Sequence, residues 1–391
     1  MIKMINFLIV LMVIFQVASA QESEELRPNT KQSLYSDILN EARGYWVSLP
    51  DSYFQEGNSY KEYPLLIVLD GDSHFNTTST MVRYMSSDRY RSWKAPEMIV
   101  VGIQNVDRRR DYTPEKIITV RENNSGGGEK FLQFLEKELI PYLDQNYRTT
   151  PYRILFGHSL SGLLATHSYM KEESAFHAFI AVDPSFGTWD EETMDQKLDT
   201  LTQKPFDRYI YFATANWGKR NFSNRDRHLR LFEALNSKSE KDFHAKLEYF
   251  EDESHSSVPL IAFHNGFSSI FKGYDISYRD VDSPSHLENH FAEISERLSW
   301  EFLPPESLVN QLGYSKLRSR EDDEKAQAID YFIMNTKNYP ESHNAYSSLG
   351  EGYEVLGKSS QALENYTKSL MLYPDNEYVK KKLSDLKQVK E

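Results

Sequence analysis

One segment of the chain holds residues that could carry out nucleophilic catalysis. It reads Arg153-Ile154-Leu155-Phe156-Gly157-His158-Ser159-Leu160-Ser161-Gly162. An apolar strand is expected to enter a tight turn with Ser159 at its apex, and a helix is expected to follow. Such a turn strains the serine backbone and exposes the hydroxyl above a sheet. Small residues must flank the turn; Gly157 and Ser161 qualify, although the second position is usually glycine. Ser159 is therefore predicted to be a nucleophile, and the alternative is a chance G-x-S-x-S turn.

A serine hydroxyl needs a base, and His255 is predicted to supply it. This residue follows a predicted strand at Ala245–Phe250 and lies in Glu251-Asp252-Glu253-Ser254-His255-Ser256-Ser257. Hydrolases built on a strand–serine–helix turn place serine, acid and histidine in that order along the chain. An imidazole can take and return a proton near neutral pH. The alternative is a solvated loop histidine.

The acid that should orient His255 is less well defined. A carboxylate is expected after the predicted strand Tyr209–Ala213, and the loop there contains only Asp226. Asp226 lies between two arginines, so a surface ion pair is at least as good an interpretation. Asp183, after the preceding strand, is the second candidate acid. A third arrangement is a serine–histidine dyad in which Asn216 or a backbone carbonyl orients the imidazole.

Backbone N–H groups are predicted to stabilise the oxyanion that forms when a serine attacks a carbonyl group. One donor is the N–H of Leu160, directly after the predicted nucleophile. The other is expected from Gly71 or Asp72, in the loop that follows the predicted strand Leu66–Leu69. Glycine in that loop would let the backbone approach a substrate closely.

Two further groups of residues could bind substrate. Arg108 and Arg110 follow a strand end, where ligands bind in open α/β sheets, and could hold an anion. Pairing with Asp107 and Asp111 is the alternative and is slightly favoured. An aromatic pocket could also be lined by three residues beyond strand ends, although each alone is more often a packing residue: Phe186, Trp189 and Trp217.

The elements that must position these residues alternate between strand and helix from about residue 40 to 272. Short apolar runs of this kind are typical of strands buried on both faces by helices. Helices are expected at Glu129–Tyr147 and Leu160–Tyr169, so a mostly parallel sheet with crossover helices is predicted, as in the α/β-hydrolase fold. The predicted strands are Gly44–Ser48, Pro64–Leu69, Met98–Ile103, Tyr152–Phe156, Ala178–Val182, Tyr209–Ala213 and Ala245–Phe250.

The two ends of the chain differ from this middle part. Residues 1–20 have a basic start, an apolar run and Ala18-Ser19-Ala20, which predicts a cleaved secretory signal peptide and no membrane span afterwards; the alternative is an uncleaved anchor. The hydrolase region is then assigned to residues 21–275. A helical connector is predicted at 276–301, with a Ser283-Pro284 start and an apolar face of Leu287, Phe291, Ile294 and Leu298.

Residues 302–391 carry the signature of a small all-α domain. Ala328, Phe332 and Pro340 lie 34 residues before Ala362, Tyr366 and Pro374, the period of a tetratricopeptide repeat. The first half of the earlier unit has about three extra residues against this register. Such repeats could bind a protein partner or pack on the hydrolase region. The alternative is a helical hairpin with chance matches.

Overall composition restricts the chemistry and the partners. The chain has 391 residues, no cysteine and a formal net charge of −13. The absence of cysteine excludes disulfides, a thiol nucleophile and a lipid attached to cysteine. Negative charge disfavours nucleic acid as a partner, and none of the 11 histidines lies in an H-E-x-x-H motif, so metal catalysis has no support. An export signal without cysteine fits a secreted or periplasmic protein.

The chain resembles the putative-esterase (esterase D type) branch of α/β-hydrolases, which includes enterobactin, salmochelin, feruloyl and acetyl esterases. The resemblance covers roughly residues 33–272 and looks closest to the siderophore esterases. It implies Ser159 as nucleophile, His255 as base, no cofactor and a small-molecule ester as substrate. The family commonly has a carboxylate near Asn216–Trp217, which this chain lacks. Four segments carry the resemblance: Leu69-Asp70-Gly71-Asp72-Ser73-His74-Phe75, Asn105-Val106-Asp107-Arg108-Arg109-Arg110-Asp111-Tyr112-Thr113-Pro114, Gly157–Gly162 and Ser254-His255-Ser256-Ser257-Val258-Pro259.

Together these observations predict a secreted serine ester hydrolase that works through an acyl-enzyme on siderophore-type lactones or on aryl or acyl esters. Two alternatives remain open. An acyltransferase would use the same serine and exclude water. A non-catalytic interaction protein would keep a degenerate hydrolase region and work through its helical repeats.

Overall fold

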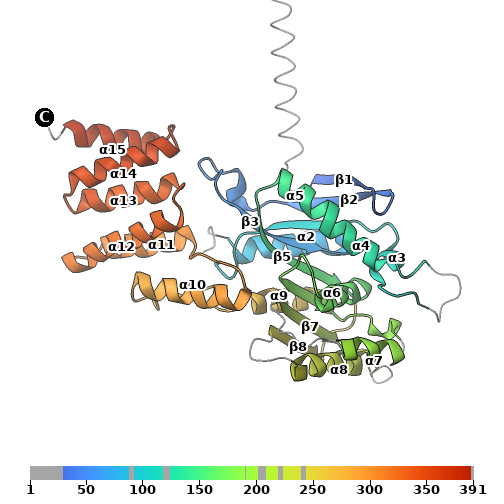
Figure 1. Cartoon of the computed structure of the whole chain (residues 1–391). Helices are drawn as coiled ribbons and strands as arrows, with labels where there is room; N and C mark the ends of the chain where they lie inside the picture. The colour runs from blue at the N-terminus through green and yellow to red at the C-terminus, as the bar shows by residue number, and fades with distance from the viewer. Residues whose placement is uncertain are drawn as a thin grey trace, which may run out of the picture.

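The computed structural model describes residues 30–87, 92–117, 124–189, 191–200, 208–218, 223–238 and 244–388. The predicted signal peptide, residues 1–20, lies outside these ranges. Figure 1 shows a central sheet wrapped by helices, with a stack of further helices at its side. Within the described ranges, no helix combines the length and apolar character needed to cross a membrane.

A single mixed sheet of eight strands forms the centre of the described structure. The first two pairings, β1 with β2 and β2 with β4, are antiparallel, and all others are parallel. In spatial order the strands are β1 (Thr30–Ser36), β2 (Glu41–Ser48), β4 (Ile99–Ile103), β3 (Tyr63–Val68), β5 (Thr149–His158), β6 (Ala178–Val182), β7 (Tyr209–Ala215) and β8 (His244–Phe250). The mostly parallel sheet and every predicted strand are confirmed. The strand that the sequence analysis missed is β1, an edge strand of alternating exposure and mainly polar residues.

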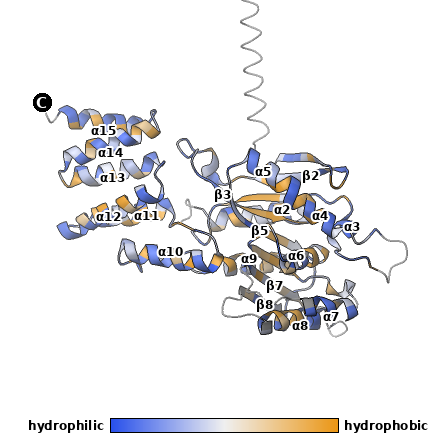
Figure 2. Ribbon diagram, viewed as in Figure 1, coloured by the Kyte–Doolittle hydropathy of each residue, from blue (hydrophilic) through white to orange (hydrophobic). Residues whose placement is uncertain are grey.

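Helices cover both faces of this sheet. One face packs against α2 (Gly71–Met85) and α9 (Val258–Ile270). The other packs against α3 (Arg108–Tyr112), α4 (Gly128–Phe134), α5 (Ile140–Asn146), α6 (Leu160–Met170), α7 (Glu191–Thr200) and α8 (Ser223–Lys238). Every residue of β3, β4 and β6 is buried, which explains why these strands read as continuous apolar runs. Figure 2 shows the apolar residues gathered on the sheet and the helix faces that meet it.

The predicted helix Glu129–Tyr147 is present but is not uniform. A π-helical turn at Leu135–Leu139 joins α4 to α5. Pro141 lies just beyond this turn and has no N–H to donate to a carbonyl one turn earlier. The widened turn is therefore the local response to a proline within a continuous helical segment.

Six helices follow the hydrolase region. The first, α10 (Pro284–Leu298), begins as predicted, with the Ser283 hydroxyl accepting a hydrogen bond from the His286 N–H at 3.1 Å. Its predicted apolar face is buried against the α2–α9 side of the core. The remaining helices are α11 (Glu306–Leu317), α12 (Asp322–Asn338), α13 (His343–Val355), α14 (Ser359–Leu372) and α15 (Glu377–Gln388).

The helix pairs α11–α12 and α13–α14 repeat one contact. A Cβ added to Gly313 would lie 2.5 Å from the Phe332 ring, and one added to Gly350 would lie 2.7 Å from the Tyr366 ring. Each glycine therefore lets the neighbouring helix of its hairpin approach closely. The extra residues of the first unit lie within the α11–α12 hairpin, because α12 has 17 residues whereas α14, its counterpart in the second hairpin, has 14. The assignment of these hairpins to the tetratricopeptide class stays a prediction.

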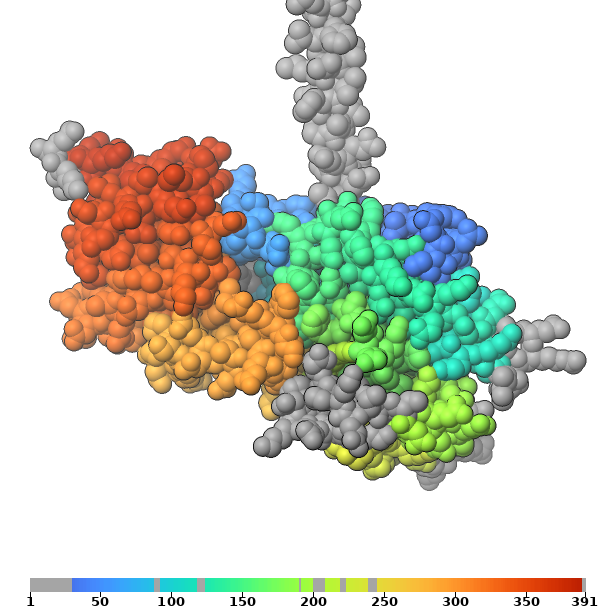
Figure 3. All heavy atoms as spheres, viewed as in Figure 1, coloured from blue at the N-terminus to red at the C-terminus, as the bar shows by residue number. Residues whose placement is uncertain are grey.

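The first of these hairpins is attached firmly to the hydrolase region. Apolar residues of α11 and α12 belong to the same buried cluster as α2, α9 and α10. The Glu306 carboxylate, only 7% exposed, accepts hydrogen bonds from Tyr60 Oη and Ser342 Oγ, each at 2.6 Å. Tyr373 also donates to Glu56. In Figure 3 the hydrolase surface near these N-terminal residues meets the orange and red helices directly.

Candidate active site

Ser159 lies at the sharp turn between β5 and α6. Its backbone has φ 62° and ψ −118°, a left-handed conformation that is costly for a residue with a side chain. Two residues earlier, a Cβ on Gly157 would overlap the carbonyl oxygen of Ser161, so only glycine fits there. The predicted strand–serine–helix turn is therefore present, and it directs the serine hydroxyl away from the strand.

Two other side chains extend from Ser159 as a continuous chain of hydrogen bonds. Ser159 Oγ lies 3.1 Å from His255 Nε2, and His255 Nδ1 lies 2.5 Å from Asp183 Oδ2. His255 comes from the loop between β8 and α9, and Asp183 follows β6. Asp183 is fully buried and also has a positive φ of 41°. The fold therefore brings a serine, an imidazole and a carboxylate together in the order that nucleophilic catalysis needs.

The electrostatics of Asp183 favour its ionised form. Burial would raise the pKa of this carboxyl, but the His255 hydrogen bond and the nearby His228 hold the pKa below its usual value. An ionised carboxylate can only accept, so Nδ1 of His255 must carry the imidazole proton. Nε2 is then left free to accept the proton of Ser159, as a general base requires.

The first candidate acid, Asp226, is placed elsewhere. It is exposed in the first turn of α8, whereas the imidazole of His255 turns to Asp183. The carboxylate is thus supplied by the loop after β6 rather than by the loop after β7. Asn216 does not orient the imidazole either, because its amide donates to the Glu251 carbonyl at 2.6 Å. His255 is therefore oriented by Asp183, the second candidate acid, and not by Asp226 or Asn216.

Of the three aromatic residues predicted to line a pocket, only Trp217 is at the site. Trp217 is 41% exposed, and its Nε1 donates to Asp183 Oδ2 at 2.8 Å while its ring lies 4.6 Å from the His255 ring. Phe186 and Trp189 are instead buried and stacked on each other at 5.0 Å. The Trp189 indole also donates to Glu115. Those two residues are part of the core, so the prediction that they line a pocket is wrong.

A second imidazole supports the His255 loop. His158 Nε2 lies 2.9 Å from the His255 carbonyl oxygen, and because a carbonyl accepts, this nitrogen carries the proton. The two rings lie 4.5 Å apart. Burial, followed by repulsion from His255 and His74, lowers the pKa of His158 to about 4. His158 therefore stays neutral beside His255 at neutral pH.

The predicted oxyanion donors lie at the starts of two helices. Leu160 opens α6, and Gly71 and Asp72 open α2, so their N–H groups have no acceptor within their own helix. Helix N-termini also carry partial positive charge, which suits a developing oxyanion. A Cβ on Gly71 would lie 2.7 Å from the backbone of Gly102, so glycine is required there for packing against β4.

Asp70 fixes these two helix starts relative to each other. Its carboxylate accepts from Ser161 Oγ at 2.7 Å and from Arg108 Nε at 2.6 Å, with a second Arg108 bond at 2.9 Å. Arg108 Nη2 also donates to the His158 carbonyl at 3.1 Å. Ser161, which stands where the motif usually has glycine, therefore links the nucleophile turn to the α2 turn. Sequence reasoning missed this role of Asp70.

The two arginines predicted to bind an anionic substrate are both engaged within the protein. Arg108 forms the two-bond fork with Asp70, which neither sequence interpretation anticipated. Arg110 pairs with Asp111 at 2.7 Å and with Glu41 at 2.6 Å. Asp107 instead caps α3 by accepting from the Arg110 N–H. The favoured pairing of Arg110 with Asp111 is therefore present, while both side chains keep about a third of their surface exposed (36% for Arg108 and 33% for Arg110), so substrate binding by these guanidinium groups stays a prediction.

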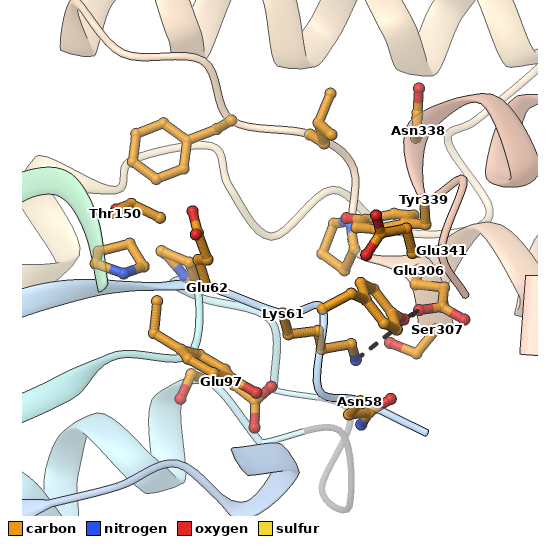
Figure 4. Close-up of a pocket in the computed structure, with 18 of the residues that line it drawn as sticks. Asn58, Lys61, Glu62, Glu97, Thr150, Glu306, Ser307, Asn338, Tyr339 and Glu341 are labelled. Carbon is orange, nitrogen blue, oxygen red and sulfur yellow. Dashed lines mark hydrogen bonds and ion pairs between the residues drawn. The ribbon is translucent and has the colours of Figure 1, made fainter. Parts of the chain in front are cut away.

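A large cavity of the described structure lies away from this site. It has a volume of about 810 Å³ and lies at the opposite edge of the sheet, between the starts of β3 and β5 and the helices that follow Trp300. Figure 4 shows Glu62, Glu97, Glu306 and Glu341 around it, with Lys61 near Glu306. This cleft belongs to the junction with the C-terminal helices and contains none of the residues around Ser159. In the described ranges, no cluster of three or more possible metal-ligating side chains occurs.

Comparison with known proteins identifies the family of this chain. The family model described as a putative esterase matches residues 36–256, which includes Ser159, Asp183 and His255. The chain belongs to the putative esterase family. It is 29% identical to the ferri-bacillibactin esterase of Bacillus subtilis (strain 168) over 216 residues, which cover 50% of this chain and 74% of that protein.

Two solved structures are similar to this esterase over a larger part of the chain. An IroE-like serine hydrolase from Shewanella oneidensis matches with a TM-score of 0.69 and 26% identity, over 78% of this chain and 98% of that one. The α/β-hydrolase fold is thereby confirmed. An uncharacterised protein from Capnocytophaga ochracea, at 19% identity and a TM-score of 0.59, shares the fold over 92% of this chain and 99% of its own.

Proposed function

We propose that this esterase is a serine hydrolase that cleaves a siderophore-type ester through an acyl-enzyme. The observation that carries the proposal is the chain of hydrogen bonds from Ser159 through His255 to Asp183. Two relatives support the substrate class: the ferri-bacillibactin esterase and a siderophore triacetylfusarinine C esterase of Aspergillus fumigatus, which is 26% identical over 40% of this chain and 56% of that protein.

In the first step, Ser159 Oγ attacks the ester carbonyl while His255 Nε2 takes its proton. The carbonyl oxygen becomes an oxyanion, which the N–H groups of Leu160 and of Gly71 or Asp72 stabilise. Asp183 stabilises the imidazolium that forms and holds it in the correct tautomer. His255 then protonates the alcohol that leaves, and Ser159 keeps the acyl group.

In the second step, His255 takes a proton from water as the water oxygen attacks the acyl carbonyl. Collapse of this second tetrahedral intermediate breaks the bond to Ser159, and His255 returns the proton to its Oγ. The products are a carboxylic acid and the regenerated enzyme. Each proton is held on a residue of this chain, so the cycle needs no cofactor.

Hydrolysis of a cyclic triester of catecholate type, with and without bound ferric ion, tests the substrate class. We expect the wild type to open the ring to linear products separable by chromatography, and Ser159→Ala to leave the ring intact. An added primary alcohol separates hydrolase from acyltransferase: a hydrolase releases free acid as its main product, whereas an acyltransferase forms the new ester. An active enzyme that cleaves p-nitrophenyl esters but no siderophore ester would contradict the substrate class alone.

Two further expectations belong to this proposal. Secretion to the periplasm or outside the cell rests on the signal sequence at residues 1–20, and N-terminal sequencing of exported protein should begin at Gln21. A protein partner at the C-terminal helices stays a prediction. Their firm attachment through Glu306 favours a fixed platform beside the hydrolase region over a free binding module.

A further inference from the structure

The hydroxyl of Ser159 has a second hydrogen-bond partner besides His255. Ser185 Oγ lies 3.0 Å from Ser159 Oγ, and the Ser185 N–H donates to the Ser159 carbonyl, also at 3.0 Å. Ser185 is two residues beyond Asp183, so the same loop supplies both side chains. Its side chain is partly exposed, and in the described ranges its hydroxyl has no partner apart from Ser159.

The number of protons available restricts what this pair can do. Ser159 has one hydroxyl proton, which must point to His255 Nε2 when the serine is ready to attack. Ser185 must then be the donor, with its own proton directed to Ser159 Oγ. In the acyl-enzyme, Ser159 Oγ is an ester oxygen and a weaker acceptor, while the Ser185 oxygen keeps lone pairs that accept no hydrogen bond from the residues that the structure describes.

The order of the strands shows on which side of Ser159 the Ser185 side chain lies. Strand β5 lies between β3 and β6. The oxyanion donors Gly71 and Asp72 follow β3, whereas Ser185 follows β6, on the side from which Asp183 approaches His255. Ser185 therefore lies on the β6 side of Ser159, away from the oxyanion donors, and this is the side on which we place the water that enters after the alcohol has left.

We propose that Ser185 is a catalytic residue of deacylation, which positions the attacking water; this inference rests on the proposed function. One water proton goes to His255 Nε2 and the other is held by Ser185 Oγ as a hydrogen bond. The water oxygen forms a bond to the acyl carbon, and the bond from that carbon to Ser159 Oγ breaks. Ser159 Oγ receives the proton from His255, while the Ser185 proton stays on its own oxygen. Such a hydroxyl favours water over an alcohol acceptor and makes the protein a hydrolase.

Steady-state kinetics of Ser185→Ala on a p-nitrophenyl ester test this role. The ratio kcat/KM reports acylation, whereas kcat reports deacylation when the acyl-enzyme accumulates. We expect kcat to fall about tenfold, the effect of one lost hydrogen bond in the transition state, with KM falling in parallel and kcat/KM within about twofold of wild type. Intact-mass spectrometry should show more acyl-enzyme during turnover.

Two variants complete the experiment. Ser185→Thr keeps the hydroxyl and should restore kcat to within about threefold of wild type. Ser174→Ala, in the loop that precedes β6, should behave as wild type. An equal fall of kcat and kcat/KM in Ser185→Ala would show that Ser185 only holds Ser159, and an unchanged kcat would show that it does nothing; either result overturns the inference. A wild type without esterase activity would instead overturn the proposed function.

Discussion

Substitution of Asp183 by asparagine should nearly abolish activity while the protein stays folded. The Oδ2 atom of Asp183 accepts from His255 Nδ1 and Trp217 Nε1, and Oδ1 accepts from the Ala215 N–H at 3.2 Å. An asparagine amide must place its N–H₂ group against at least one of these donors. If it faces His255, Nδ1 must lose its proton and Nε2 must gain it, so Ser159 has no base.

The size of the effect follows from this change of tautomer and from the loss of the negative charge. A hydrogen bond to a charged group contributes about 1.5–3 kcal/mol, and the imidazolium formed in the transition state loses its counter-ion. A decrease in kcat/KM of about 10³–10⁴-fold, or roughly 4–5.5 kcal/mol, is therefore expected. The measurement is p-nitrophenyl ester hydrolysis between about pH 6 and 9, with folding checked by circular dichroism.

Asp226→Asn is the matched control for this substitution. Asp226 is exposed on α8, so its loss should leave kcat/KM within about twofold of wild type. A folded Asp183→Asn variant that keeps more than about a tenth of the wild-type kcat/KM would refute the reasoning. Such a result would mean that Ser159 and His255 work as a dyad.

Three other substitutions give sharp expectations. Arg108→Lys loses the two-bond fork to Asp70, so kcat/KM should fall about 10–100-fold through displaced oxyanion donors; unchanged kinetics would contradict this role. His158→Gln tests the pH dependence of stability: because the pKa of His158 in the folded protein, about 4, lies below the ordinary 6.5, wild-type stability should decline as the pH falls from about 6.5 to about 4. The urea midpoint of the variant should decline less steeply over this pH range. Equal declines for the two proteins would contradict the low pKa of His158. Glu306→Ala leaves the hydroxyls of Tyr60 and Ser342 without their acceptor and should lower the free energy of unfolding by about 2–4 kcal/mol, while kcat/KM at 25 °C stays unchanged; an equally stable variant would contradict the firm attachment of α11.

Local sequence was enough to predict the sheet and the nucleophile turn. Strands such as β6 are apolar throughout because helices cover both of their sides, and a short apolar run identifies them. The turn at Ser159 depends on small residues at fixed spacing. Strand β1 could not be found in this way, because an edge strand with alternating polar residues resembles a loop.

The partners of the site residues depend on how distant loops meet. Asp183 and His255 are 72 positions apart. Chain order could not show that the carboxylate next to the imidazole comes from the loop after β6 and not from the loop after β7. Arg108 and Asp70 are 38 positions apart, so the sequence offered only the neighbouring aspartates as partners. The aromatic residues show the same limit, because Trp217 and Trp189 both follow strands yet only Trp217 lies beside His255.

Covalent labelling by a fluorophosphonate probe is the most direct test of the serine mechanism. Wild-type protein should bind one equivalent of the probe, and peptide mass spectrometry should locate it on Ser159. Ser159→Ala should stay unlabelled while it keeps the wild-type circular dichroism spectrum, and Asp183→Asn should label far more slowly than Asp226→Asn. Folded wild-type protein that resists the probe, or that carries it on a residue other than Ser159, would contradict the assignment of Ser159, His255 and Asp183 as the reacting group, its base and its acid.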